Sequence, residues 1–277
     1  EEFDGAHDAL NDARACGKVY PVMRDKEWKF NDIGVKRIVL KASDIAAIVG
    51  KNRYKKPNEI IDNLWSKYKP ETFEGKTKDQ KAYDAIQKCD LAKNLLQETE
   101  TYKSINSYDV EQKFKAVSNQ VDLYSKLRGE DKTNAIDYLR KKLYTNHGTR
   151  HEDTTADNYD DFEVDEKYYT YPVCSLEGTD YEIVGRIDRI HTDSDGIKTI
   201  VEIKNRTRGL FKTVRDYEEV QCQTYMEMLD IDNCQLIEQY NESRLGYKLN
   251  RDRQTWLSEI KPRLINFCRH FHSLLSK

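Results

Sequence analysis

The sequence of 277 residues lacks any apolar run that approaches the roughly 18 residues needed to cross a membrane, and charges occur throughout its N-terminal part. Internal repeats and low-complexity linkers are absent too. The six cysteines are Cys16, Cys89, Cys174, Cys222, Cys234 and Cys268. They form no C-x-x-C pair, which argues against structural zinc, an iron-sulfur cluster or a disulfide scaffold. We therefore expect a soluble, intracellular protein with no membrane contact and no iron-sulfur cluster.

The chain also has little net charge. A formal charge of -3 gives no overall attraction to a polyanion, so any such attraction must come from local segments. Residues 36–56 carry seven basic side chains and one acidic side chain, and residues 204–215 carry five basic side chains and no acid. Residues 152–166 carry eight carboxylates and no base. Positive segments flanking a negative one fit a polyanion held beside a metal pocket, although single charge runs are more often solvated surfaces.

Hydrophobic periodicity predicts an α/β protein with a mixed sheet. At 32.6 kDa we expect one large domain, or a core with a helical annex. Helices are predicted at 6–15, 42–50 (capped by Ser43 and stopped by Gly50), 57–68, 79–96, 110–127, 133–144, 146–160, 214–229 and 253–275. Strands are predicted at 162–173, 180–191, 197–204, 234–240 and 245–249, with a hairpin turn at 193–196.

Two carboxylates stand near the ends of neighbouring β-type runs. Asp188 ends the run 181–188, and Glu202 lies fourteen residues later in the run 198–204. Glu202 and Lys204 are two residues apart, so they point to the same face of a strand. Other Glu-x-Lys triplets, such as the one at 259–261 in a segment with helical periodicity, lack this context. The hairpin is expected to bring both carboxylates and the ammonium group to one point.

Oxygen ligands of this kind suit Mg²⁺, and phosphodiester hydrolysis is a reaction that such a metal catalyses. Asp188, Glu202 and the backbone carbonyl of Ile203 are the predicted ligands, with Lys204 polarising the attacking water. Glu152 is the candidate third carboxylate, although on sequence alone a surface residue in a solvated acidic run is the commoner interpretation. The following helix places Tyr217, Gln221 and Tyr225 on one face, either to support the site or only to cover the sheet.

Four ordered motifs resemble the PD-(D/E)XK nuclease superfamily, in particular the lambda exonuclease and YqaJ-type viral recombinase branch. They are Gly185-Arg186-Ile187-Asp188 with Glu202-Ile203-Lys204, Gln221-Cys222-Gln223-Thr224-Tyr225-Met226, Gly148-x-x-x-Glu152-x-x-x-Ala156-x-x-Tyr159, and Lys41-Ala42-Ser43-Asp44-Ile45-Ala46 with Gly50-x-x-x-Tyr54. The similarity covers about residues 36–68 and 146–242. It implies a restriction-endonuclease-like core at 146–277 and a mainly helical part at 1–145 whose segment 36–68 binds DNA ends.

The resemblance further implies a Mg²⁺-dependent 5′ to 3′ exonuclease on linear double-stranded DNA, with Mn²⁺ as a substitute. By the same resemblance, the enzyme would act in recombination, repair or removal of foreign DNA. It would form a trimer and work with a single-strand annealing protein. Asp188, Glu202 and Glu152 would hold metal, Lys204 would activate water and Gln221 would support them. The residues implied or expected to contact DNA are Ser43, Lys36, Arg37, Arg53, Tyr54, Arg206, Arg208 and Tyr225.

Two features depart from the family pattern. Lys36 stands where the family has a phosphate-binding arginine, with Arg37 one place away, and residues 70–135 match no motif. A structure-selective endonuclease or nickase, and a Cas4-like nuclease without its cluster, are alternatives because a metal centre does not encode end preference. A catalytically idle DNA-binding protein of the same fold is a third.

Overall fold

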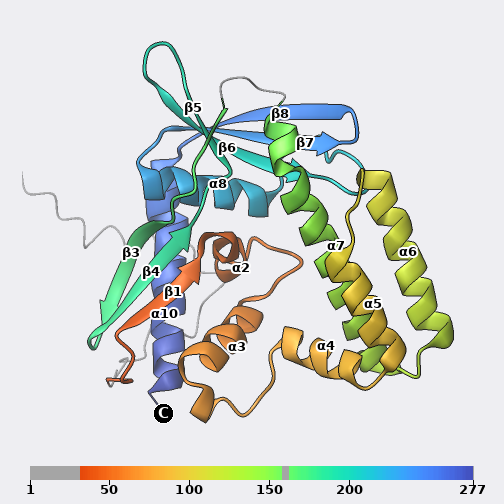
Figure 1. The fold of residues 1–277 in the computed structure, drawn as a ribbon. Coiled ribbons are helices and arrows are strands. Elements are labelled where there is room, and N and C mark those ends of the chain that lie inside the picture. The colour runs from red at the N-terminus through yellow and green to blue at the C-terminus, as the bar shows by residue number, and fades with distance from the viewer. Residues whose placement is uncertain (1–31, 158–161, 277) are drawn as a thin grey trace, which may run out of the picture.

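The β-strands form two separate sheets. In this computed structural model, which describes residues 32–157 and 162–276, the larger sheet has the order β2-β5-β6-β7-β8 and the smaller has β1-β4-β3 (Figure 1). The strands are β1 (Arg37–Lys41), β2 (Phe162–Val164), β3 (Tyr169–Leu176), β4 (Thr179–Gly185), β5 (Arg189–Thr192), β6 (Lys198–Asn205), β7 (Asn233–Tyr240) and β8 (Ser243–Asn250). Both sheets mix parallel and antiparallel pairs, so the expected mixed α/β class is confirmed, with two sheets in place of one.

Helices flank both sheets. The helical elements are η1 (Ala42–Asp44), α2 (Ile45–Ile48), α3 (Pro57–Tyr68), η2 (Pro70–Thr72), α4 (Lys78–Gln87), α5 (Asp90–Thr101), α6 (Ser107–Tyr124), α7 (Gly129–Ala156), α8 (Asp216–Leu229), α9 (Arg253–Thr255), the π-helical turn η3 (Trp256–Ile260) and α10 (Lys261–Leu275). Within the described residues, no helix is long and apolar enough to cross a membrane.

The centre of the larger sheet is β6, which pairs antiparallel with β5 and parallel with β7. Ile200, Val201 and Ile203 of β6 are buried on both faces, as expected for a strand covered by helices on either side. Helix α8 makes the crossover from β6 to β7 and packs against the first helical turns, η1 and α2 (Figure 1). Strand β6 therefore lies in the interior, between α7 and α8.

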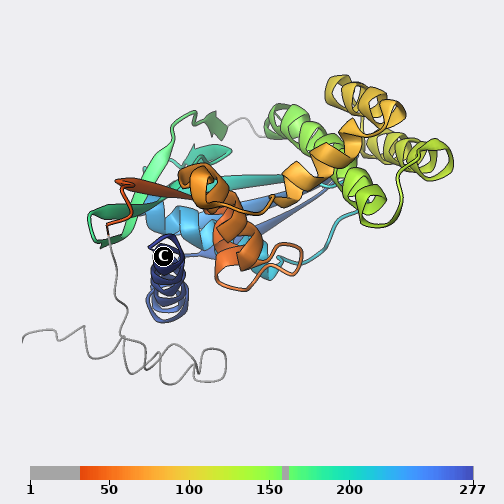
Figure 2. The ribbon, with the colours of Figure 1, turned by 90° about the horizontal axis from the view of Figure 1, so that it is seen from below.

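Helices α4 to α7 form a second part beside the sheets, with its own apolar core (Figure 2). Helix α7 belongs to both parts, because Leu139 and Leu143 lie in the helical core while its last turns pack on β6. The predicted boundary between residues 145 and 146 falls inside this helix. The final turns of α7 therefore reach the sheet as the end of a 28-residue helix.

Several predicted helices differ in extent. The helix predicted at 79–96 is two helices, α4 and α5, separated by an extended Cys89. The helices predicted at 133–144 and 146–160 are instead the single α7, in which Gly148 is tolerated because tertiary packing outweighs its cost of about 1 kcal/mol. Ser43 does not cap the helix at 42–50, since η1 begins one residue earlier without a side-chain cap. The predicted helix at 6–15 and Tyr159 lie outside the described residues.

The predicted strand at 162–173 is divided into β2 and the start of β3, and that at 180–191 into β4 and β5. Strands β4 and β5 belong to different sheets, so the chain changes sheet at residues 186–188. The hairpin turn at 193–196 is present between β5 and β6, with Gly196 in a left-handed conformation. Helix α3 begins and ends where the sequence predicts, with Pro57 in its first turn.

Candidate active site

Asp188 and Glu202 face each other across the β5–β6 pair. Arg189 is in register with Val201, so Asp188, just before β5, stands opposite Glu202. Asp188 therefore precedes β5 and does not end the strand before it. Its Oδ2 accepts a hydrogen bond of 2.7 Å from the backbone N–H of Ile203, which fixes the carboxylate against β6.

Lys204 and Gln221 converge on the same carboxylate. The Lys204 ammonium donates to Oε1 of Glu202 and, at 3.2 Å, to Oε1 of Gln221. The Gln221 amide donates to Oε1 of Glu202 at 2.9 Å and to the hydroxyl of Tyr225 at 3.2 Å. The site is therefore a closed hydrogen-bonded group built from one face of β6 and one face of α8.

Glu202 is only 3% exposed, and its second oxygen, Oε2, is buried with no hydrogen-bond partner among the described residues. Burial, followed by the charge of Asp188, raises the pKa of Glu202 to about 7. Burial works against the charge of Lys204, but Glu202 and Asp188 outweigh it and hold the Lys204 pKa above its ordinary value. An orphaned buried oxygen on a carboxylate implies that a cation or donor is needed there.

Glu152, on the last turns of α7, adds a third carboxylate beside these two. Burial, followed by the charge of Asp188, raises the pKa of Glu152 to about 7, although Arg186, Lys204 and Arg189 oppose the rise. Three carboxylates that disfavour one another's charge suit a divalent cation. Nevertheless, in residues 32–157 and 162–276, no group of three or more His, Cys, Asp or Glu side chains has the geometry of a metal site. The carboxylate oxygens of Asp188, Glu202 and Glu152 are still the type of ligand that a hard cation prefers.

Residues that the sequence did not single out tie α7 to this site. Asn205 follows Lys204 and bonds to α7 at Gly148 and Thr155, and Arg189 follows Asp188 and pairs with Asp153. Their positions next to the two motifs were the only signal available in the sequence. Their partners on α7 are far away along the chain and follow only from the fold.

Gly185 allows the smaller sheet to approach α8. A Cβ atom at Gly185 would lie 2.7 Å from Cβ of Ala42 and 2.8 Å from Cε1 of Tyr225, closer than real Cβ contacts allow. The Tyr225 hydroxyl in turn accepts a hydrogen bond from the Gln221 amide. The glycine of the Gly-Arg-Ile-Asp motif is therefore a packing requirement of the site.

We expect Gly185→Ala to destabilise the protein by about 1–3 kcal/mol, as overpacking of a core typically does, and to displace Tyr225. Thermal unfolding measures the effect. The matched control is Gly246→Ala in β8, where the added methyl meets only the flexible end of Gln235 at 3.2 Å. Equal melting temperatures for the two variants would contradict the packing role.

The segment after α2 reaches the rim of the site. Tyr54 is 61% exposed, and its ring lies edge-on to Tyr217 of α8 at 5.9 Å between centroids. The Arg53 guanidinium lies 4.6 Å from the Tyr54 ring centroid and also contacts its hydroxyl. Ser43 is exposed in η1. Because Tyr217 is one turn before Gln221 on α8, Tyr54 and Arg53 lie near the part of α8 that carries Gln221.

Lys36 and Arg37 lie at the opposite end of β1 from Ser43. Arg37 pairs with Glu182 at 2.5 Å, and the Lys36 ammonium lies near Gly178 in the β3–β4 turn. Five residue steps from Lys36 to Lys41 at about 3.3 Å each give roughly 16 Å of strand. The structure therefore does not bring either basic residue together with Ser43.

Arg206 is buried and paired with two carboxylates, whereas the sequence predicted a side chain free to contact DNA. Its guanidinium is enclosed between Glu218 at 2.7 Å and Glu238 at 2.6 Å, and it lies 4.0 Å from the centroid of Phe211. The side chain is only 10% exposed, so we assign it to holding the β6–α8 loop. Arg208 is 58% exposed and contacts Glu111 and Tyr144 of the helical part.

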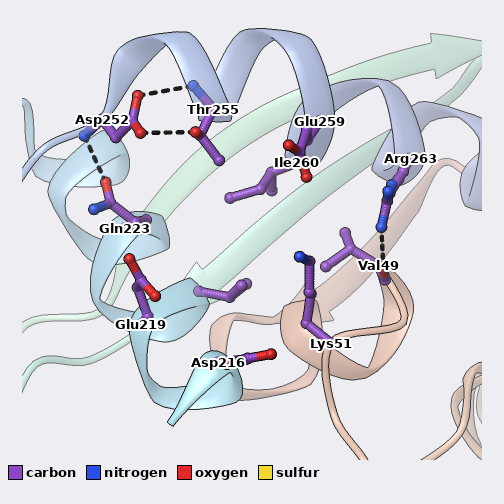
Figure 3. A pocket seen from close by; sticks show the side chains of 11 residues that line it. Val49, Lys51, Asp216, Glu219, Gln223, Asp252, Thr255, Glu259, Ile260 and Arg263 are labelled. Carbon is purple, nitrogen blue, oxygen red and sulfur yellow. Dashed lines mark hydrogen bonds between the residues drawn. The ribbon is translucent and has the colours of Figure 1, made fainter. Parts of the chain in front are cut away.

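Within the described residues, two cavities have none of the three carboxylates in their lining. One, of about 310 Å³, has no contribution from Gln221 in its lining. It contains Lys51 and Arg263 among four acidic side chains (Figure 3). Several of its lining residues bond to one another, because Asp252 caps the turn at Thr255 and Arg263 donates to the carbonyl of Val49 (Figure 3). The other, of about 380 Å³, lies between α7 and the β7–β8 turn. Neither is lined by Asp188, Glu202 or Glu152.

No family model and no curated protein match this sequence. Several solved structures do match it. The crystal structure of SSO0001 is 17% identical, covering 64% of this chain and 83% of that chain with a TM-score of 0.37. An alkaline exonuclease, LHK-Exo from Laribacter hongkongensis, is 11% identical, covering 66% and 88% with a TM-score of 0.36. A phage-related exonuclease from Haemophilus somnus 129PT is 13% identical, covering 86% and 95% with a TM-score of 0.35. Two of these three structures are described as exonucleases, and all three likenesses are distant.

Proposed function

We propose that this protein is a divalent-metal-dependent deoxyribonuclease that degrades linear double-stranded DNA from 5′ to 3′. The observation that carries the proposal is the convergence of Glu202, Lys204 and Gln221 beside Asp188 and Glu152, with one oxygen of Glu202 buried and unpaired. Mg²⁺ is the proposed metal, with Mn²⁺ as a substitute, because carboxylate oxygens are hard ligands. The polarity of digestion comes from the family resemblance.

Asp188, Glu202, Glu152 and the Ile203 carbonyl would hold the metal. A bound divalent cation supplies charge stabilisation for the phosphate and lowers the pKa of a water molecule. Lys204 has three donors, of which Glu202 and Gln221 each accept one, so a third remains to orient water or a phosphate oxygen. Gln221 fixes this geometry by bonding to both charged partners without adding charge.

DNA would enter past the exposed group of Ser43, Arg53 and Tyr54. Tyr54 presents an aromatic face and Arg53 a guanidinium, which are the side chains that stack on bases and contact phosphates. Arg208, Lys36 and Arg37 are proposed as outer phosphate contacts. A trimeric assembly and a single-strand annealing partner belong to the proposal by resemblance alone.

The test compares three substrates in Mg²⁺ and in Mn²⁺: linear duplex with a 5′ phosphate, linear duplex with a 5′ hydroxyl, and covalently closed circular DNA. We expect the linear duplexes to be degraded, the phosphorylated one faster, and the circle to survive. Cutting of the circle would identify an endonuclease or nickase. No cutting of any substrate would leave a DNA-binding protein of this fold.

We expect cleavage at limiting metal to rise between about pH 6 and pH 8. Glu152 and Glu202, with pKa values of about 7, must lose their protons before they can bind a cation. Higher metal concentration should move the midpoint to lower pH, because the cation competes with protons. Single-turnover rates at several metal concentrations measure this, and a midpoint that stays fixed would contradict the assignment.

The same two groups predict how the metal-free protein responds to pH. Their folded pKa values lie above the ordinary value of 4.5, so the folded protein binds more protons than the unfolded chain between about pH 4.5 and pH 7. This contribution to stability is present below pH 4.5 and is lost as the pH rises through 7. Added Mn²⁺ should therefore raise the melting temperature more at pH 8 than at pH 5.

A further inference from the structure

Asn205 holds the segment of α7 that carries Glu152. Its amide nitrogen donates to the carbonyl oxygen of Gly148 at 3.1 Å, and its amide oxygen accepts from the hydroxyl of Thr155 at 2.7 Å. Residues 148, 152 and 155 are spaced i, i+4 and i+7, so they lie on one face of the helix. Glu152 therefore lies between the two points at which Asn205, the neighbour of Lys204, binds α7.

Arg189 makes a second connection from the other carboxylate strand. One arm of its guanidinium donates to the backbone carbonyl of Asp188 at 2.6 Å, and another pairs with the carboxylate of Asp153. Arg189 is only 6% exposed, although the Asp153 side chain is 81% exposed. The residue next to Asp188 is thus joined to the residue next to Glu152.

The position of Glu152 depends on these two connections. Glu152 lies in the last turns of α7, and the first half of that helix packs in the separate helical core. The contacts of Asn205 and Arg189 hold its last turns against β6 and β5. A misplacement of about 1 Å is enough to reduce the activity of a catalytic group by roughly a hundredfold.

We propose that Asn205 and Arg189 are positioning residues that set the Glu152 carboxylate against those of Asp188 and Glu202. The inference rests on the proposed function, because it assigns these contacts to a metal centre. Asn205 follows Lys204 and Arg189 follows Asp188 by one position. The two strands that carry Glu202 and Asp188 therefore also fix α7, the helix that carries the third proposed ligand, Glu152. Contacts that orient ligands in this way contribute about 10–100-fold to metal affinity or activity.

A purely structural role for Asn205 predicts a different result. In that case its loss lowers the melting temperature but leaves the metal affinity of the folded protein unchanged. Asn146 offers a matched control, because it lies on the same helix and its amide donates to the carbonyl of Thr99 on α5 at 3.3 Å. Asn146→Ala removes a similar hydrogen bond from α7 at a point away from the carboxylates.

The experiment measures Mn²⁺ binding by isothermal titration calorimetry on the full chain, without DNA. We expect Asn205→Ala and Thr155→Val to bind Mn²⁺ about 10–100-fold more weakly than wild type, and Asn146→Ala to bind like wild type. Thr155→Val removes only a hydroxyl and preserves the side-chain shape, so it decides the matter if Asn205→Ala fails to fold. Arg189→Lys keeps the charge but loses the guanidinium fork, and should weaken binding in the same direction.

The outcomes separate the positioning role from the function itself. A wild-type protein that neither binds Mn²⁺ nor cuts DNA would overturn both. If wild type binds and cuts while folded Asn205→Ala and Thr155→Val bind Mn²⁺ equally well, the positioning role is wrong and the proposed function stands. Saturating metal should partly restore cleavage by Thr155→Val without changing its KM for DNA, which a general loss of folding would not do.

Discussion

Replacing Glu202 by glutamine should reduce DNA cleavage by about a thousandfold or more. A metal ion contributes several kcal/mol of transition-state stabilisation, and each 1.36 kcal/mol is a factor of about ten in rate. The substitution keeps the shape and one acceptor oxygen, but it removes the charge and the buried Oε2 that lacks a partner. Single-turnover digestion of a linear duplex measures the rate, and calorimetric titration measures the loss of Mn²⁺ binding.

The fold should survive this change. The amide oxygen of glutamine can still accept from Lys204 and Gln221, and an uncharged group suits a site that is 3% exposed. The chain provides its own control in the second Glu-Ile-Lys triplet at 259–261, which lies in the helical segment around η3. Glu259→Gln should cleave at the wild-type rate. A Glu202→Gln protein that also cleaved at that rate would remove Glu202 from the active site.

Local sequence signals predicted β6 and its hairpin with β5, although not the change of sheet before Asp188. The β-branched run ending in Glu202-Ile203-Lys204 and the turn at 193–196 specify a hairpin through contacts that are close along the chain. The i, i+4 spacing of Gln221 and Tyr225 likewise predicted their shared face on α8. These features depend on neighbouring residues, so they could be predicted from the pattern.

Helix α7 shows why other parts could not be predicted. Asn146 and Gly148 are weak helix formers, and the local pattern therefore suggested two helices. The helix continues because its first half packs in the helical core and its last turns pack on β6. Apart from α6, which directly precedes it, the partners of α7 are tens of residues away along the chain, and their effect is visible only in the folded chain.

Arg206 shows a second limit of sequence patterns. Its place in a run of five basic residues suggested contact with DNA, as a charge run often does. The fold instead supplies two carboxylates, Glu218 from α8 and Glu238 from β7, which enclose it. A buried arginine with two acidic partners is a tertiary arrangement, and composition alone cannot distinguish it from a surface cation.

Replacing Lys204 by methionine should reduce cleavage by roughly 10²- to 10⁴-fold, the range for loss of a group that assists proton transfer. Metal binding should persist, because the carboxylates remain and their repulsion increases when the ammonium is lost. The pKa values of Glu202 and Glu152 should rise further, since the charge of Lys204 lowers both. The pH profile of the residual activity should therefore move to higher pH, which distinguishes loss of Lys204 from loss of a ligand.

Stability should change with pH in the same variant. At pH 8 the buried Glu202 carboxylate would lose its ionic partner, and breaking a buried pair typically costs about 3–5 kcal/mol. At pH 5 Glu202 is protonated, so the melting temperature should fall less, and Mn²⁺ should restore much of the loss at pH 8. Lys261→Met, in the helical triplet, should change neither property. A Lys204→Met protein that cleaved like wild type at saturating metal would show that Lys204 only neutralises charge, and water activation would then have to come from the metal and Glu152.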